Sequence, residues 1–96
     1  MGKRYIKGYI NRTRVEIARS EGAMKQIKEG ELAGLNYGLL EMDNDYSYMV
    51  IERYKDKLEE SRKQEGVNNL IHLQGAIMGL TLVMEVIKRK EAAAWL

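Results

Sequence analysis

One segment, residues 67–91 (VNNLIHLQGAIMGLTLVMEVIKRKE), is apolar almost all the way round when it is read as a helix. Its apolar side chains recur at helical spacing in two stripes. The first stripe consists of Leu70, Leu73, Ile77, Leu80, Met84 and Ile87, and the second of Ile71, Met78, Leu82 and Val86. A helix without a broad polar face has to be buried, in protein or in lipid. The rest of the chain therefore has to cover this helix.

Gly75 and Gly79 lie one turn apart within the same segment. A glycine costs a helix interior about 1 kcal/mol relative to alanine, so a close approach by another backbone is the expected compensation. We predict that these glycines, together with the second stripe, form a close-packed or oligomeric contact. The residues of this predicted contact are Ile71, Gly75, Met78, Gly79, Leu82 and Val86.

The N-terminal segment supports two interpretations. Residues Ile6, Ile10, Thr13, Ile17, Ser20, Met24 and Ile27 follow one another at steps of three and four, which predicts one helix through about residue 28. A hairpin over residues 4–10 and 14–19 is the alternative, because side-chain character also alternates there. We favour the helix, since its pattern extends over more turns, and we expect residues 1–5 to be flexible.

A second helix is predicted over residues 31–42, after an interruption at Gly30. Its inward residues would be Leu32, Leu35, Leu39 and Met42. On a different face, glycine recurs every fourth residue, at Gly30, Gly34 and Gly38. This repeat indicates either a weak, mobile helix or a second close-packing surface, set against Gly75 and Gly79.

A third helix is predicted over residues 46–65, with one apolar and one charged face. Its inward residues would be Ser47, Val50, Ile51, Tyr54, Leu58 and Ser61. On the charged face, opposite charges lie three or four residues apart, as in Lys55 and Glu59. Such pairs contribute only about 0.2–0.5 kcal/mol each to a solvated helix.

These elements predict an all-α fold, a small bundle of three to four helices built around a buried C-terminal helix. The chain of 96 residues makes a single domain over residues 1–96, with a flexible tail at about 92–96. Short helices with one apolar side do not easily cover a helix that is apolar on both sides. We therefore expect a homodimer, in which two copies of the central helix meet.

The composition argues against an enzyme. The chain has no cysteine, and His72 is its only histidine, so thiolate chemistry and a histidine-rich metal site are excluded. Glu85 is the one acid within the apolar helix, and it is read as part of a polar sector beside Gln74. We predict no catalytic residues, no cofactor and no metal site. A cysteine-free chain that begins without an apolar signal segment is expected to be cytoplasmic.

The strongest candidate for a functional surface is the basic start of the chain. Residues 1–28 carry eight Lys and Arg against two Glu, whereas residues 29–60 carry three against nine acids. The predicted surface for nucleic acid or an acidic partner consists of Lys3, Arg4, Tyr5, Lys7, Tyr9, Arg12 and Arg14. Cations of this kind bind phosphates while tyrosines stack on bases. The simpler interpretation pairs them with the acidic 41–60 face of the same or a neighbouring subunit.

Membrane insertion is a third interpretation. Nineteen residues without a formal charge run from Gly66 to Met84 and precede Glu85 and a basic cluster. Polar residues at Asn68, Asn69, His72 and Gln74 shorten the apolar part below the roughly 20 residues that a span needs. A tail-anchored protein is therefore the least favoured of the three functions.

The run from Leu70 to Leu80, with LQGAIMGL within it, resembles the last helix of small helical accessory proteins of bacteriophages and prophages. The resemblance covers about a tenth of the chain. It implies a binder of proteins or of nucleic acid and no particular activity. Taken together, the sequence predicts a non-catalytic adaptor or inhibitor that acts through protein–protein contacts, with nucleic-acid binding as the alternative.

Overall fold

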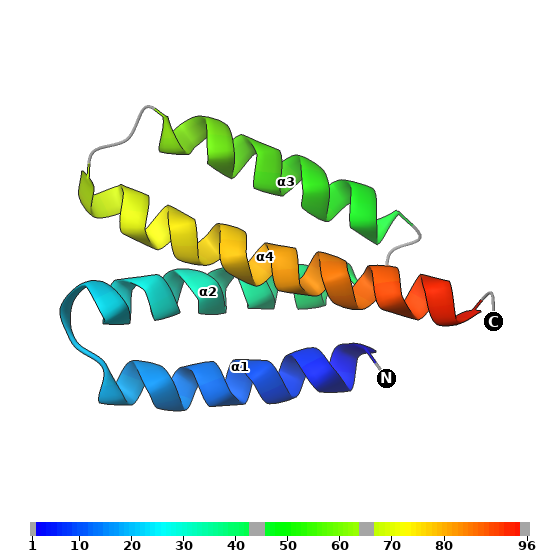
Figure 1. The fold of residues 1–96 in the computed structure, drawn as a ribbon, viewed down its shortest axis with the longest axis horizontal. Helices are drawn as coiled ribbons and strands as arrows, with labels where there is room; N and C mark the ends of the chain where they lie inside the picture. Colours follow the sequence, from blue (N-terminus) through cyan, green and yellow to red (C-terminus); the bar gives the residue numbers. More distant parts are fainter. Residues whose placement is uncertain (1, 43–45, 64–66, 95–96) are drawn as a thin grey trace.

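The computed structural model describes residues 2–42, 46–63 and 67–94, and all of its elements there are α-helices. They are α1 (Gly2–Arg19), α2 (Gly22–Glu41), α3 (Ser47–Arg62) and α4 (Val67–Ala94). The predicted all-α bundle built around the C-terminal helix is confirmed. α4 packs most extensively on α2 and next on α3, while α1 packs mainly on α2 (Figure 1). The α2–α4 pair therefore lies in the middle, with α1 and α3 on opposite sides of it.

The first helix is real, and its predicted end is wrong. The hairpin alternative is excluded because residues 2–19 are helical, including most of the start that was expected to be flexible. The helix stops at Arg19 rather than near residue 28, because Gly22 adopts a φ of +61° that L side chains rarely reach. The chain turns at residues 20–21 and α2 runs without a break through Gly30, where the sequence had predicted an interruption.

Close packing explains why the glycines do not break α2. A Cβ added at Gly30 or Gly34 would clash with the carbonyl oxygens of His72 and Ala76 on α4. On α4, a Cβ at Gly75 or Gly79 would meet the α2 carbonyl oxygens of Ile27 and Glu31 in the same way. Of the two interpretations of the glycine repeat, the structure therefore shows the close-packing one. We call these four glycines the glycine seam.

The core contains residues from all four helices. Its fully buried side chains are Ile6, Leu35, Ile51, Leu80, Val83 and Thr13, the last with its hydroxyl donating to the Tyr9 carbonyl oxygen at 2.9 Å. In the first stripe of α4, Ile77, Leu80, Met84 and Ile87 are buried, whereas Leu70 and Leu73 are half-buried. The second stripe is less covered, because Ile71, Leu82 and Val86 are half-buried and Met78 is 45% exposed.

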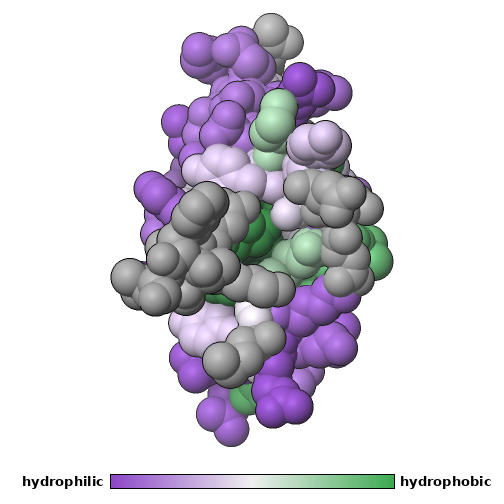
Figure 2. Space-filling model, turned by 90° about the vertical axis from the view of Figure 1, so that its right-hand side faces the viewer, coloured by the Kyte–Doolittle hydropathy of each residue, from purple (hydrophilic) through white to green (hydrophobic). Residues whose placement is uncertain are grey.

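The outer surface is polar on two sides of the bundle. Figure 2, which views the end of the molecule at which α4 finishes, shows hydrophilic surface at the top and bottom and hydrophobic surface between them. The top and bottom correspond to α3 and α1. The molecule measures 43 × 30 × 18 Å, so it is a thin slab whose middle layer is the α2–α4 pair.

Candidate binding surfaces

The basic residues predicted from the sequence all lie on α1, and the helix continues their series to Arg19. Six basic residues and one acid occur in α1. We define the basic face of α1 as Lys3, Arg4, Lys7, Arg12, Arg14 and Arg19; all of these are exposed except Lys3, which is half-buried. The sequence interpretation stopped at Arg14. Arg19 could have been added from the sequence, because the helical pattern of this segment continues beyond Arg14.

Helical spacing arranges these cations in two rows. Lys3, Lys7 and Arg14 are four and seven residues apart and form one row, while Arg4, Arg12 and Arg19 are eight and seven apart and form the other. The buried side of α1 carries Ile6, Ile10 and Thr13. The row with Arg4, Arg12 and Arg19 lies opposite this buried side, whereas the row with Lys3, Lys7 and Arg14 lies at its edge.

The two tyrosines of this segment differ in their surroundings. Tyr5 is 55% exposed, whereas Tyr9 is half-buried and packs on the core. Their ring centroids are 6.3 Å apart, and the Arg12 guanidinium lies over the Tyr9 ring at 5.5 Å from its centroid. Tyr5 is thus available for stacking on a partner, while Tyr9 holds Arg12 by a cation–π contact.

The structure tests one part of the alternative that pairs the basic face with the acidic 41–60 segment, namely pairing with α3 of the same chain. Over the described residues α1 and α3 make no contact, because the α2–α4 pair separates them (Figure 1). The one acid of α1, Glu16, forms an ion pair with Lys28 of α2, in which the Lys28 Nζ lies 2.7 Å from the Glu16 Oε2. Five cations of the basic face are therefore presented to solvent without an acidic helix beside them.

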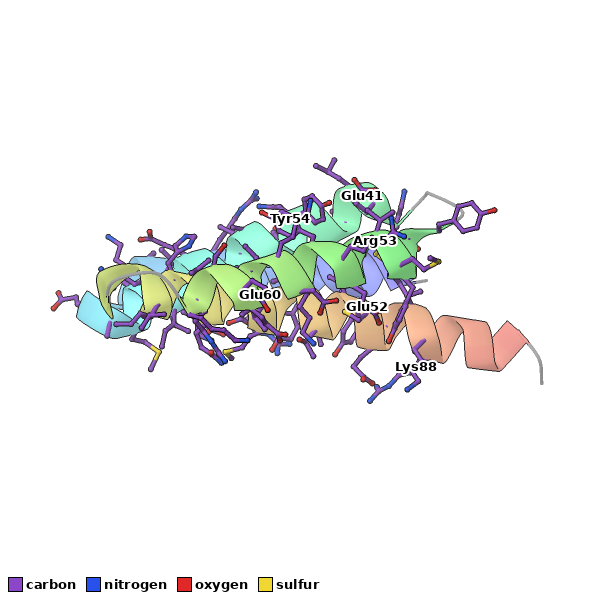
Figure 3. The ribbon with its side chains drawn as sticks, turned by 90° about the horizontal axis from the view of Figure 1, so that it is seen from above. Glu41, Glu52, Arg53, Tyr54, Glu60 and Lys88 are labelled. Atoms are coloured by element: carbon purple, nitrogen blue, oxygen red, sulfur yellow. The ribbon has the colours of Figure 1, made fainter. Side chains whose placement is uncertain are left out.

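The predicted acidic face is mixed in charge. Along α3, the acids Glu52, Asp56, Glu59 and Glu60 are balanced by Arg53, Lys55, Lys57 and Arg62. Figure 3 looks onto α3 and shows Glu41, Arg53 and Tyr54 on one side of the helix, and Glu52 and Lys88 on the other. Two further acids of the 41–60 segment, Asp43 and Asp45, lie outside the described residues. Within α3 itself the charges therefore balance, whereas those of α1 are mainly basic.

A buried acid that the sequence did not single out lies between α1, α2 and α4. Glu31 is only 5% exposed, and Lys28 contacts its carboxylate at 3.5 Å. The hydrogen bond to Glu16, together with the charge of Glu31, raises the pKa of Lys28 against the opposing effect of burial. Lys28 thus joins α1 to α2 through Glu16 and compensates the buried charge of Glu31.

Removing this cation is expected to destabilise the fold. Lys28→Met leaves Glu31 buried without its positive partner, and we expect a loss of about 1–2 kcal/mol, because Lys28 is itself partly exposed. Lys25→Met, which removes an exposed lysine from the same helix, is the control and should change stability by less than about 0.5 kcal/mol. Urea denaturation followed by circular dichroism measures both. Equal effects of the two substitutions would contradict the compensating role of Lys28.

Two titratable residues of α4 that the sequence analysis considered, His72 and Glu85, lie at the surface of the described structure. His72 is exposed on α4 and Glu85 is exposed as well, and no group of three potential metal ligands occurs among the described residues. An open hollow of about 400 Å³ lies between α2, α3 and α4 and is lined by Ile27, Arg62, Leu70, Ile71 and Gln74. Arg62 donates to the Gln74 side-chain oxygen at 2.6 Å there, so its charge already has a polar partner.

Two aromatic rings join α2 to α3. The rings of Tyr37 and Tyr54 stack with their centroids 4.1 Å apart, and burial, with the nearby Glu41, raises the pKa of Tyr37. Direct contact between these two helices is otherwise slight, since both pack mainly on α4. The stack therefore fixes the position of α3 on the side of the bundle opposite to α1.

One part of α4, Leu70–Arg89, is long and apolar enough to cross a membrane by length and composition, and 44% of that window is buried in the bundle. Core helices of soluble proteins meet the same criterion. In this fold α2 and α3 cover two sides of the helix.

Comparison of the chain with protein-family models, with curated proteins and with solved structures found no match in any of the three.

Proposed function

We propose that this chain is a non-catalytic binding protein whose basic face of α1 binds an acidic surface of a partner protein. The observation that carries the proposal is the separation of charges in the fold. α1 has six basic residues and one acid, and that acid is paired with α2. Ile6 and Ile10 anchor α1 in the core, so the backbone that carries the exposed cations needs no ordering when a partner binds.

Nucleic acid is the second candidate partner, and the two rows of cations favour it. An 18-residue helix is about 27 Å long. Cations on both flanks of such a helix can contact phosphates on the two sides of a groove, and the exposed ring of Tyr5 can stack on a base. Arginine, which makes up four of the six cations, binds carboxylates and phosphates equally well in bidentate geometry. The basic face therefore favours an anionic partner. Measuring its binding to a polycarboxylate and to nucleic acids distinguishes the two candidates.

Binding to the basic face is expected to weaken steeply with salt and with the loss of one row of arginines. We would measure fluorescence anisotropy with poly-L-glutamate, a 20-base-pair DNA duplex and a 20-nucleotide single-stranded RNA, at 50 and 200 mM salt. The variant Arg4→Ala/Arg12→Ala/Arg19→Ala should bind its preferred probe roughly ten-fold more weakly or worse. A matched control, Arg53→Ala/Lys57→Ala/Lys63→Ala, removes the same charge from exposed positions at α3 and should bind like the wild type.

Each outcome decides between the candidates. Tightest binding to polyglutamate supports the acidic protein partner. Tightest binding to DNA or RNA, lost in the α1 variant, supports the second candidate instead. If no probe binds at 50 mM salt, or if the α3 control weakens binding as much as the α1 variant, the basic face is not the binding surface.

A further inference from the structure

The side of α1 that faces away from the core carries uncharged residues at regular helical spacing. α1 lies at the edge of the bundle (Figure 1), so this side is open to solvent. The residues follow one another at steps of three, four and three, and all are exposed; they are Gly8, Asn11, Val15 and Ala18. We call these four residues the outer line of α1. Steps of this kind are the spacing at which two helices contact each other along their length.

Cations flank the outer line on both sides. In the letters of a heptad repeat, the outer line occupies positions a and d. Lys7 and Arg14 then occupy position g, and Arg12 and Arg19 occupy position e. Within α1 no acid stands at either flanking position. Charges at e and g decide which helix can pair with the outer line, so a partner helix has to be acidic at the facing positions.

Gly8 differs from the four glycines of the glycine seam. A Cβ at each of those would meet the backbone of a facing helix, whereas a Cβ at Gly8 has nothing within 4 Å. Gly22 is also open, but its φ of +61° explains why a glycine stands there. A glycine inside a helix is less stable than an alanine, and no contact within this chain compensates that cost at Gly8. A helix that approaches α1 from outside would compensate it, as α4 does for α2.

We propose that the outer line of α1 is the docking site for an acidic helix of a partner protein. This inference rests on the proposed function and specifies which element of the partner binds. The partner helix places apolar residues along its own a and d positions. A large side chain such as leucine fits opposite the gap at Gly8, because large and small residues alternate across a well-packed contact. Glutamates or aspartates beside that apolar line face the four flanking cations.

The uncharged middle of this surface favours a helix over nucleic acid. Val15 is 50% exposed between the flanking cations and gains from burial against another apolar side chain. Most contacts of proteins with nucleic acid go to phosphates and sugars, which give cations a partner but leave an aliphatic side chain without one. Because α1 is already helical and anchored in the core, only the partner has to become ordered on binding.

The first experiment compares two labelled acidic peptides by fluorescence anisotropy. The helix probe has about three heptads, with leucine at a and d, glutamate at e and g and alanine elsewhere. A scrambled peptide has the same composition and charge without the heptad spacing. The wild-type protein should bind the helix probe roughly ten-fold more tightly than the scrambled peptide. Equal affinities would overturn the helix docking, because charge alone would then account for the binding.

The second experiment fills the gap at Gly8. Gly8→Gln adds an uncharged side chain at an exposed position and improves the helix propensity of α1. The variant should bind the helix probe roughly ten-fold more weakly, because the added side chain keeps the two helices apart. Its binding to poly-L-glutamate, which needs only the cations, should stay within about two-fold of the wild type. Ala23→Gln adds the same side chain to an exposed position of α2 and should change neither affinity.

These measurements separate the helix docking from the proposed function. If Gly8→Gln binds the helix probe as tightly as the wild type, the outer line is not the docking site, while binding to poly-L-glutamate still supports the proposed function. If the wild type binds neither probe at low salt, both proposals fail. If the DNA duplex binds more tightly than the helix probe, and Arg12→Ala/Arg19→Ala weakens that binding, nucleic acid occupies this side of α1 and the helix docking is wrong.

Discussion

Replacing Gly34 by alanine is expected to destabilise the protein by about 2–3 kcal/mol, although alanine is the better helix former. The added Cβ would clash with the Ala76 carbonyl oxygen and lie 3.1 Å from the Leu80 amide nitrogen. Both atoms belong to the backbone of α4, so relief requires the two helices to separate. Separation loosens the packing around Leu35 and Leu80, which are fully buried. A shift of this size lowers the melting temperature of a domain of this length by roughly 10–20 °C.

The matched control is Gly8→Ala, because a Cβ at Gly8 has nothing within 4 Å. Gly8 lies on the exposed side of α1, so the substitution removes only the cost of glycine in a helix and should stabilise by about 0.5–1 kcal/mol. Thermal denaturation of both variants by circular dichroism gives shifts of opposite sign. A Gly34→Ala protein as stable as the wild type would show that the glycine seam is not close-packed.

The spacing of the glycines is visible in the sequence, but the sequence does not show whether they loosen a helix or allow two helices to pack closely. Three glycines at every fourth position in 30–38 and two in 75–79 indicated either a loose helix or a tight contact, and local propensity favours the first. Only the placement of α2 against α4 decides, because the cost of each glycine is compensated by packing between distant segments. The same reasoning explains the misplaced break. Gly30 is tolerated inside α2 because it contacts α4, whereas Gly22, with its positive φ, lies at the turn that separates α1 from α2.

The sequence predicted which residues form the basic face, but it predicted only in part what surrounds them in the fold. The cations of α1 follow from composition, and their exposure follows once Ile6, Ile10 and Thr13 are known to face the core. Of the acidic 41–60 segment, α3 does not reach the basic face, since α1 and α3 lie on opposite sides of the α2–α4 pair. The burial of Glu31 had no sequence signal of its own, because a glutamate three residues after a lysine usually lies on a solvated face.

The exposure of Met78 and the depth of the core are two results of one arrangement. α4 has more apolar surface than α2 and α3 can cover, so one side of it is fully enclosed and another is not. Leu80 belongs to the enclosed side and has no exposed surface. Met78, two residues earlier, is 45% exposed. Substitutions at Leu80 should accordingly lower the stability of the fold much more than substitutions at Met78.

Leu80→Ala is expected to cost about 2–5 kcal/mol, because the loss of buried methyl groups adds to the cost of the cavity that they leave. Leu80 is fully buried in the core cluster with Leu35 and Ile51. The cavity forms beside the contact of Gly34 with α4, and the backbone contacts of the glycine seam prevent the helices from collapsing into it. A domain of this length has only about 5–15 kcal/mol of stability in total, so at the middle of both ranges the midpoint of urea unfolding should fall by about a third.

Two further variants keep this prediction testable if Leu80→Ala fails to fold. Ile51→Val removes one methylene from the equally buried residue of α3 and should cost about 0.5–1.5 kcal/mol. Leu40→Ala removes the same atoms as Leu80→Ala from a side chain that is 78% exposed, and it should leave the midpoint nearly unchanged. If Leu40→Ala lowers the midpoint as much as Leu80→Ala, Leu40 is buried in solution. In that case the end of α2 is covered by a partner.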